Sequence, residues 1–122
     1  MVKVLVVDDS ATVRARLVAM LRELPGVELV EASAGEEALE ILRVSFCDLV
    51  VLDVHLPGKS GIEVLPAIKA LPSAPVVVVL TSHPTDQHRQ LSLARGADLF
   101  LDKSLDFARV AELVAARAMR RA

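Results

Sequence analysis

The sequence has no excess of basic residues and almost no aromatic ones. Among its 122 residues, 14 are Lys or Arg and 16 are Asp or Glu, which gives a formal net charge of −2, and it contains three Phe but neither Trp nor Tyr. Proteins that bind nucleic acid carry a basic surface, and those that bind single strands add aromatic side chains on which the bases stack. We therefore expect no direct nucleic acid binding by this domain.

Long apolar runs and cysteine pairs are missing as well. The longest apolar run, Ala74 to Leu80, contains Pro75 and is much too short to span a bilayer. The first apolar segment begins at Val2 and suits a strand, so we expect no signal peptide. Cys47 is the single cysteine, so it forms no internal disulfide and suits a small buried residue in a reducing compartment. We expect a cytoplasmic protein with no membrane partner.

The chain does contain a regular alternation of apolar runs and amphipathic segments. Its hydrophobic fraction of 53% and charged fraction of 25% are those of a soluble globular domain. Continuous apolar runs predict buried strands, and apolar residues at helical spacing predict helices, so the alternation predicts an α/β fold with a parallel sheet covered on both faces. The predicted strands are 2–7, 27–32, 49–52, 76–80 and 99–101; the predicted helices are 13–24, 35–46, 61–71, 85–95 and a last one capped by Asp106.

The apolar content of each strand predicts its place in the sheet. The second strand, 27–32, alternates apolar and charged residues and suits an edge, whereas the first, third and fourth strands are almost wholly apolar and suit the interior. A doubly wound sheet with strand order 2-1-3-4-5 satisfies both conditions. In such sheets ligands bind beyond the carboxyl ends of the strands, at the switch point between the first and third strands.

Turn and cap signals surround the third strand. Pro57-Gly58 suits a type II turn, and Ser60 with Glu63 has the spacing of a capping box, so a helix should start there. Pro66 lies inside that helix and should bend it or delay its regular part. Gly96 is suited to end the following helix.

Polar side chains follow four of the five predicted strands, at one edge of the sheet. Crowded carboxylates need a compensating cation, and oxygen ligands favour Mg²⁺. A carboxylate can act as a nucleophile toward phosphorus, while a metal, a lysine and a hydroxyl stabilise the transferred phosphoryl group. The set predicts a phosphoryl-transfer site, and its members are Asp8, Asp9, Asp53, Thr81, Ser82 and Lys103.

Each of these residues also has a purely structural interpretation. Asp8 and Asp9 could cap the first helix, although Ser10 and Thr12 could do so without doubling a charge. Thr81 and Ser82 could cap the fourth helix, and Lys103 could be a solvated loop residue. The convergence of all of them on one edge favours the functional interpretation.

The sequence resembles a response regulator receiver domain of two-component signal transduction, which has a flavodoxin-like, CheY-like fold, and the resemblance spans the whole chain. No single tripeptide is specific, but the ordered set of motifs is. These motifs are Val6-Val7-Asp8-Asp9-Ser10, Leu52-Asp53, Leu56-Pro57-Gly58 with Gly61, Leu80-Thr81-Ser82, Gly96-Ala97-Asp98 and Phe100-Leu101-Asp102-Lys103.

The resemblance implies a role for each site residue. Asp53 would accept a phosphoryl group from a sensor histidine kinase or a phosphotransfer protein, in a self-catalysed transfer followed by autodephosphorylation rather than enzymatic turnover. Mg²⁺ would be held by Asp9, Asp53 and the backbone carbonyl of His55, with Asp8 acting largely through water. The implied switch consists of Thr81, which binds the phosphoryl group, and Phe100, while Lys103 pairs with the phosphate.

Two positions depart from the family pattern. Ser104 follows the lysine where proline is common, and Ser82 stands where a smaller residue is frequent. His55 and His83 fall at variable positions on the rim. A histidine pair invites a metal interpretation, but it also suits exposed loop residues that tune the access of water.

Three other functions compete with this interpretation. An aspartyl-phosphate phosphatase acting on small phosphate esters usually has a second acid two residues after its nucleophile, where this chain has His55. A flavin or nucleotide binder needs a Gly-rich or Ser/Thr-rich loop after the first strand, where this chain has two acids. A receiver that binds partners without phosphorylation would not need the intact acidic set.

The whole chain, 1–122, is expected to be a single receiver domain with no effector domain, either acting in trans as a stand-alone regulator or cut from a longer one. Its downstream protein target is unknown, and a weak homodimer is a further partner to consider.

Overall fold

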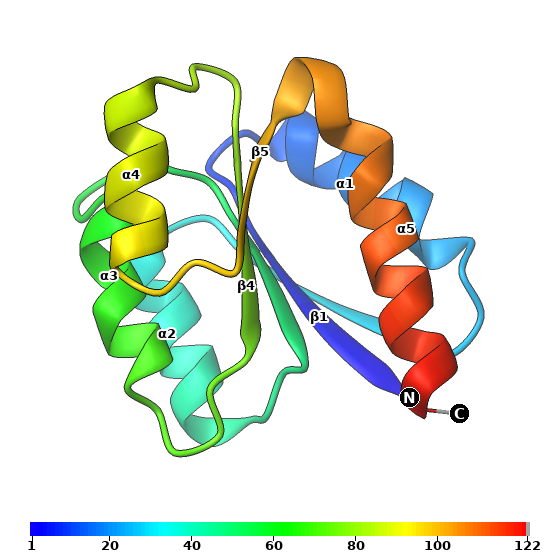
Figure 1. The fold of residues 1–122 in the computed structure, drawn as a ribbon. Helices are drawn as coiled ribbons and strands as arrows, with labels where there is room; N and C mark the ends of the chain where they lie inside the picture. The colour runs from blue at the N-terminus through cyan, green and yellow to red at the C-terminus, as the bar shows by residue number, and fades with distance from the viewer. Residues whose placement is uncertain (122) are drawn as a thin grey trace.

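The computed structural model describes residues 1–121 and folds them into a parallel sheet between two layers of helices (Figure 1). The strands lie in the order β2-β1-β3-β4-β5, as the sequence predicts. Every neighbouring pair is parallel, with Val4 opposite both Leu29 and Leu49 and with Leu49 opposite Val76. The elements are β1 (Val2–Val7), α1 (Ala11–Arg22), β2 (Val27–Ala32), α2 (Gly35–Val44), β3 (Leu49–Leu52), α3 (Gly61–Lys69), β4 (Val76–Thr81), α4 (Asp86–Ala94), β5 (Leu99–Asp102) and α5 (Lys103–Arg121).

Two hydrophobic clusters fill the space on either side of the sheet. Along β1, Val2, Val4 and Val6 point to one side, where they pack with residues of α1 and α5, while Leu5 and Val7 point to the other, where they pack with residues of α2 and α3. All four residues of β3 are buried, whereas β2 at the edge is buried only at its last residue. The carboxyl end of β3 therefore lies in the interior of the sheet, between β1 and β4.

The segment after β3 has the local structure that its sequence predicts. Gly58 has a φ of 71°, which suits the third position of a type II turn, and Ser60 and Glu63 form a capping box at the start of α3. Pro66 does not delay the helix, which begins at Gly61. Its missing N–H leaves the carbonyl of Ile62 without its helical donor, and the guanidinium of Arg95 donates to that carbonyl at 3.4 Å.

The predicted start of the last helix is wrong. Helix α5 begins at Lys103, directly after β5, and Asp106 lies within its first turn. The carboxylate of Asp102 accepts hydrogen bonds from the backbone N–H and the hydroxyl of Ser104, so Asp102 takes the capping role that the sequence analysis assigned to Asp106. Asp106 instead accepts from the N–H of Asp102.

The other element boundaries differ from the prediction by only a few residues. Helix α2 ends at Val44 because Ser45 is extended, and α3 ends at Lys69 rather than at Leu71. Strand β4 extends to Thr81 and β5 to Asp102. In the described part of the chain, no helix is long and apolar enough to cross a bilayer.

Candidate functional site

The first pair of acids follows directly from β1. The N–H of Asp8 donates to the carbonyl of Ala32 on β2, which continues the sheet ladder past Val7. Its carboxylate accepts from the N–H of Ser10 at 2.9 Å, and the hydroxyl of Ser10 in turn caps α1. Asp8 is therefore buried and Asp9 exposed, and Ser10, rather than either acid, caps the helix.

Asp53 is held at the end of β3 by its own backbone. Its N–H donates to the carbonyl of Val7 at 3.0 Å, and one carboxylate oxygen, Oδ1, accepts from the N–H of His55 at 3.2 Å. Gly61 packs against the carbonyl of Asp53 so closely that an added Cβ would overlap it. Only glycine lets the start of α3 approach the strand end in this way.

Lys103 joins the two buried acids. Its ammonium lies 2.6 Å from Oδ2 of Asp8 and 3.1 Å from Oδ2 of Asp53, and its side chain is only 13% exposed. It is therefore not a solvated loop lysine. Because Lys103 is the first residue of α5 and immediately follows β5, the strand and helix together fix its position.

The electrostatics of this triad follow from burial. Burial raises the pKa of Asp53 above its ordinary value; Lys103 opposes that change and Asp8 adds to it, so the net shift is upward. Burial alone would lower the pKa of Lys103, but its hydrogen bond to Asp8 and its attraction to Asp53 outweigh this effect and raise it. When Asp8 and Asp53 are both ionised, the single positive charge of Lys103 neutralises only one of them.

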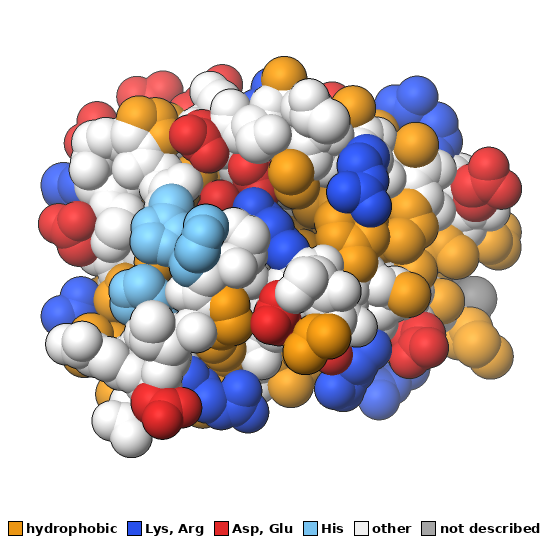
Figure 2. Space-filling model, turned by 90° about the horizontal axis from the view of Figure 1, so that it is seen from above, with side chains coloured by type: hydrophobic (Ala, Val, Ile, Leu, Met, Phe, Trp, Pro, Cys, Tyr) orange, Lys and Arg blue, Asp and Glu red, His pale blue; other side chains and the backbone are white. Residues whose placement is uncertain are grey.

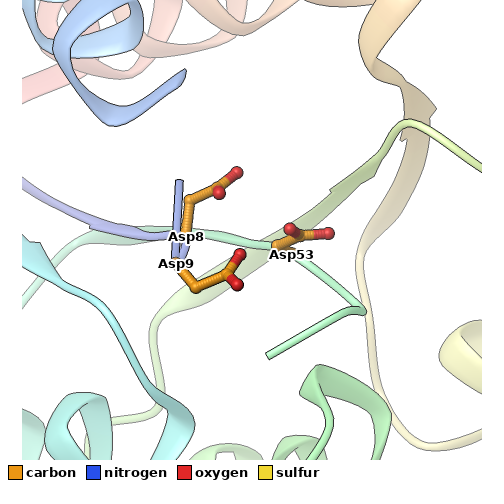
Figure 3. Close-up of side chains that lie close together, drawn as sticks. All are labelled: Asp8, Asp9 and Asp53. Carbon is orange, nitrogen blue, oxygen red and sulfur yellow. The ribbon is translucent and has the colours of Figure 1, made fainter. Parts of the chain in front are cut away.

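Three carboxylates lie close together (Figure 3). Asp8, Asp9 and Asp53 each offer an oxygen, and these oxygens lie within 4.8 Å of one another. A set of hard oxygen donors with an uncompensated negative charge suits Mg²⁺. The residues present therefore fit the ion that the sequence analysis predicts.

The structure separates the two hydroxyls that follow β4. Thr81 is fully buried and its Oγ1 accepts a long hydrogen bond, 3.4 Å, from the N–H of His83. Ser82 is exposed and lines the cavity above Asp53. Neither hydroxyl caps α4, because Thr85 does so through the N–H of His88.

Phe100 lies inside the protein. It is 6% exposed and packs in the hydrophobic cluster of the α2–α3 face. The guanidinium of Arg89 on α4 lies 5.8 Å from the centre of its ring. The predicted switch residue is therefore already buried below α4.

The cavity above the acids has a volume of about 630 Å³ and is lined partly by histidines. His55, His83 and His88 all line this cavity, and Figure 2 shows histidine side chains gathered beside acidic and basic ones on this face. His55 and His83 were expected on this rim from the sequence, whereas His88 was not. The signal that identifies His88 is its position three residues after Thr85, which places it in the first turn of α4 facing the loops.

The fold and site define a class: a parallel flavodoxin-like sheet that carries an acidic triad and a lysine at its switch point. Residues 4–115 match the response regulator receiver domain family, and the chain belongs to that family. In the described residues, the strand order and helix arrangement are those of receiver domains.

Known proteins agree with this assignment. The chain is 41% identical over 88 residues to a protein-glutamate methylesterase/protein-glutamine glutaminase of Desulfotalea psychrophila, covering 71% of this chain and 24% of that protein. It is 39% identical over 101 residues to the transcriptional regulatory protein CpxR of Escherichia coli K12, covering 83% of this chain and 42% of that protein. The receiver domain of the response regulator NarL from Mycobacterium tuberculosis superposes with a TM-score of 0.87 at 28% identity, covering 97% and 96% of the two chains. The chain thus spans less than half the length of these two curated relatives.

Proposed function

We propose that this receiver domain is a phosphorylation-dependent signalling switch in which Asp53 accepts a phosphoryl group from a phosphohistidine of a sensor histidine kinase or phosphotransfer protein. The observation that carries the proposal is the pairing of Lys103 with both Asp8 and Asp53. One carboxylate is enough to neutralise the charge of a buried lysine, so the second acid is not required for that purpose. The lysine does supply a cation beside the oxygen on which phosphate would be built.

The chemistry follows from the two oxygens of Asp53. In the transfer, an oxygen of the carboxylate attacks phosphorus while the bond between phosphorus and the donor imidazole breaks. The imidazole keeps the electron pair of that bond and, because its other ring nitrogen carries a proton, leaves as a neutral ring. Lys103 and the N–H of His55 already bind the carboxylate and would keep it oriented. Mg²⁺, held by Asp8, Asp9, Asp53 and the backbone carbonyl of His55, would neutralise phosphoryl oxygens as they approach.

The switch would begin at Thr81. Among the described residues, the one hydrogen bond of its hydroxyl is the 3.4 Å bond that it accepts from the N–H of His83, so turning the hydroxyl toward a phosphoryl oxygen would release the start of the β4–α4 segment. Phe100 is already buried, so we propose that the change reaches the α4–β5–α5 surface through this segment and Arg89 rather than through entry of Phe100 from solvent. The recipient of the signal is a protein target of this domain.

The test is labelling with a small phosphodonor. The protein is incubated with acetyl phosphate and Mg²⁺, and the acyl phosphate is detected by intact mass and by its loss on hydroxylamine treatment. We expect the wild type to gain one phosphoryl group and Asp53→Asn to gain none. Asp86→Asn, which changes an exposed acid in the first turn of α4, is the matched control and should be labelled like the wild type. Equal labelling of Asp53→Asn and wild type would exclude Asp53 as the acceptor, and steady turnover of an added phosphomonoester would favour a phosphatase instead.

A further inference from the structure

Arg14, on α1, reaches back to the acidic end of β1. Its Nη1 donates to the backbone carbonyl of Asp8 at 2.6 Å, and its Nε lies 3.3 Å from a carboxylate oxygen of Glu31 on β2. The side chain of Arg14 is 20% exposed, so most of it is covered by the protein. One arginine therefore connects α1, the end of β1 and the edge strand.

The sheet register brings Glu31 to Arg14. Glu31 lies opposite Val6 of β1, and Val6 packs on the side of the sheet that α1 covers. Residues that lie opposite each other on neighbouring parallel strands point to the same side, so Glu31 also points toward α1. Its carboxylate orients the guanidinium, which then presents a second donor to the carbonyl of Asp8.

The carbonyl that Arg14 binds belongs to the peptide group between Asp8 and Asp9. On the other side of Asp8, the backbone N–H donates to the carbonyl of Ala32 at 3.1 Å, so both of its backbone polar groups are bonded. A peptide group is planar, and its orientation is set by the ψ of Asp8 and the φ of Asp9. The bond to Arg14 therefore helps to set the direction in which the Asp9 side chain leaves the backbone.

Asp9 depends on its backbone more than the other two acids do. The carboxylates of Asp8 and Asp53 are both bound by Lys103. The exposed carboxylate of Asp9, in contrast, makes no hydrogen bond or ion pair with any residue that the structure describes. Its position beside Asp53 (Figure 3) is therefore a consequence of the backbone conformation.

We propose that Arg14 is a positioning residue for the Mg²⁺ site, because its bond to the Asp8 carbonyl holds the Asp9 carboxylate toward the other acids. This inference rests on the Mg²⁺ site of the proposed function. Groups that orient metal ligands without touching the ion typically change metal affinity by about 10- to 100-fold when they are removed. The charge of Arg14 acts in the opposite direction, since a cation near the acids repels Mg²⁺. Loss of Arg14 therefore weakens Mg²⁺ binding if the residue positions Asp9, and strengthens it if the residue acts through its charge alone.

The experiment titrates MgCl₂ into the full chain at constant ionic strength and measures the affinity by calorimetry or by NMR amide shifts. We expect Arg14→Met to bind Mg²⁺ at least about ten-fold more weakly than the wild type. Arg14→Lys keeps the charge and can still donate to the carbonyl, so its affinity should lie between the two. Arg16→Met is the matched control, because Arg16 is an exposed arginine of the same helix that stacks on Phe107 instead, and it should bind Mg²⁺ at least as tightly as the wild type. Circular dichroism verifies that each variant is folded at the temperature of the titration.

A second measurement needs no metal. A hydrogen bond to the Asp8 carbonyl polarises the peptide group whose N–H belongs to Asp9. In the metal-free protein, the amide signal of Asp9 should therefore shift in Arg14→Met and keep its position in Arg16→Met.

An Mg²⁺ affinity of Arg14→Met equal to or higher than that of the wild type would overturn the inference, and so would an unchanged Asp9 amide signal. Neither result would affect the proposed function while the wild type binds Mg²⁺ and Asp53 accepts phosphate. A wild type that binds no Mg²⁺ would overturn both the metal site and the role of Arg14.

Discussion

The ammonium of Lys103 lies closer to Asp8, at 2.6 Å, than to Asp53, at 3.1 Å. The lysine is thus anchored on the acid that is not the proposed phosphoacceptor. Asp8 is 3% exposed in its side chain and would keep Lys103 in place while the charge on Asp53 changes. This pairing leads to the first prediction.

Lys103→Met should destabilise the fold strongly. Removing one member of a buried ion pair leaves an uncompensated charge and costs about 3–5 kcal/mol. Denaturant unfolding followed by circular dichroism measures the loss without Mg²⁺. The double variant Lys103→Met, Asp8→Asn should recover a large part of it, and equal stability of both variants would show that Asp8 does not depend on Lys103.

Asp53→Asn should raise the melting temperature at neutral pH in the absence of divalent ions. Burial and the neighbouring Asp8 raise the pKa of Asp53, so the folded state binds its proton more tightly than the unfolded state. Stability then falls as pH rises through the window from the ordinary carboxyl pKa to the raised one, and the loss persists above it. The variant should lack this part of the pH dependence, and Asp86→Asn should retain it. A lower melting temperature for Asp53→Asn than for wild type at neutral pH would contradict the sign.

Mg²⁺ should stabilise the protein because it relieves repulsion among the three acids. A ligand that binds only the folded state and is present at 100 times its dissociation constant adds about 2.7 kcal/mol to the free energy of unfolding. Asp9→Ala should abolish the increase in melting temperature. The chain lacks Trp and Tyr, so calorimetry or circular dichroism must report unfolding. A melting temperature of the wild type that does not change with Mg²⁺ would contradict the proposed Mg²⁺ site.

Gly61→Ala should destabilise the protein and impair labelling of Asp53 together. The added methyl overlaps the carbonyl of Asp53, a rigid backbone atom, and overpacking of this kind costs about 1–3 kcal/mol. Gly58→Asn is the matched control because Gly58 has a positive φ of 71° that Asn tolerates and open space around its Cα. Normal phosphoryl labelling of Gly61→Ala would show that the carboxyl end of β3 can shift to accommodate the methyl group without affecting Asp53.

Thr81→Ala should accept phosphate but switch incompletely. A hydrogen bond to a charged group contributes about 1.5–3 kcal/mol, and a shift from 1:99 to 99:1 needs about 5.5 kcal/mol, so loss of one bond leaves a partial shift. Amide shifts across α4, β5 and α5, recorded with and without beryllofluoride, measure it. Ser82→Ala tests whether the exposed hydroxyl that lines the cavity substitutes for the buried one.

Strands and turns were predictable where one local cause decides them. β1 and β3 have the predicted bounds because their apolar runs end at acidic residues, and β2 has them because its alternating segment lies between Gly26 and Ser33. The cap was wrongly assigned to Asp106 because Asp102, which β5 positions at the start of α5, accepts from the N–H of Ser104, whereas Asp106 lies within the first turn and accepts from the N–H of Asp102. The residue at which β5 ends therefore decides which aspartate caps α5.

The site was predictable as a set of residues but not in its internal pairing. Strand order brings Asp8, Asp53 and Lys103 to one edge, yet which acid the lysine prefers depends on side-chain geometry. Thr81 and Ser82 looked equivalent in sequence, and the pleat buries one while exposing the other. His88 escaped notice because its partners are distant along the chain and meet it only after folding.

Arg95, at the C-terminal end of α4, donates a hydrogen bond to the carbonyl of Ile62, which Pro66 leaves without its helical donor. The two ends of α4 therefore differ in how firmly they are held. Near its C-terminal end, Ser92 is buried, and Asp98, just beyond the helix, binds both Lys69 and the N–H of Val77. Its N-terminal end begins at the exposed Thr85. We therefore expect α4 to pivot about Arg95, so that a small displacement near Thr81 becomes a larger sweep of the outer turn. A proline in the neighbouring helix would thus determine which end of α4 moves in the proposed switch.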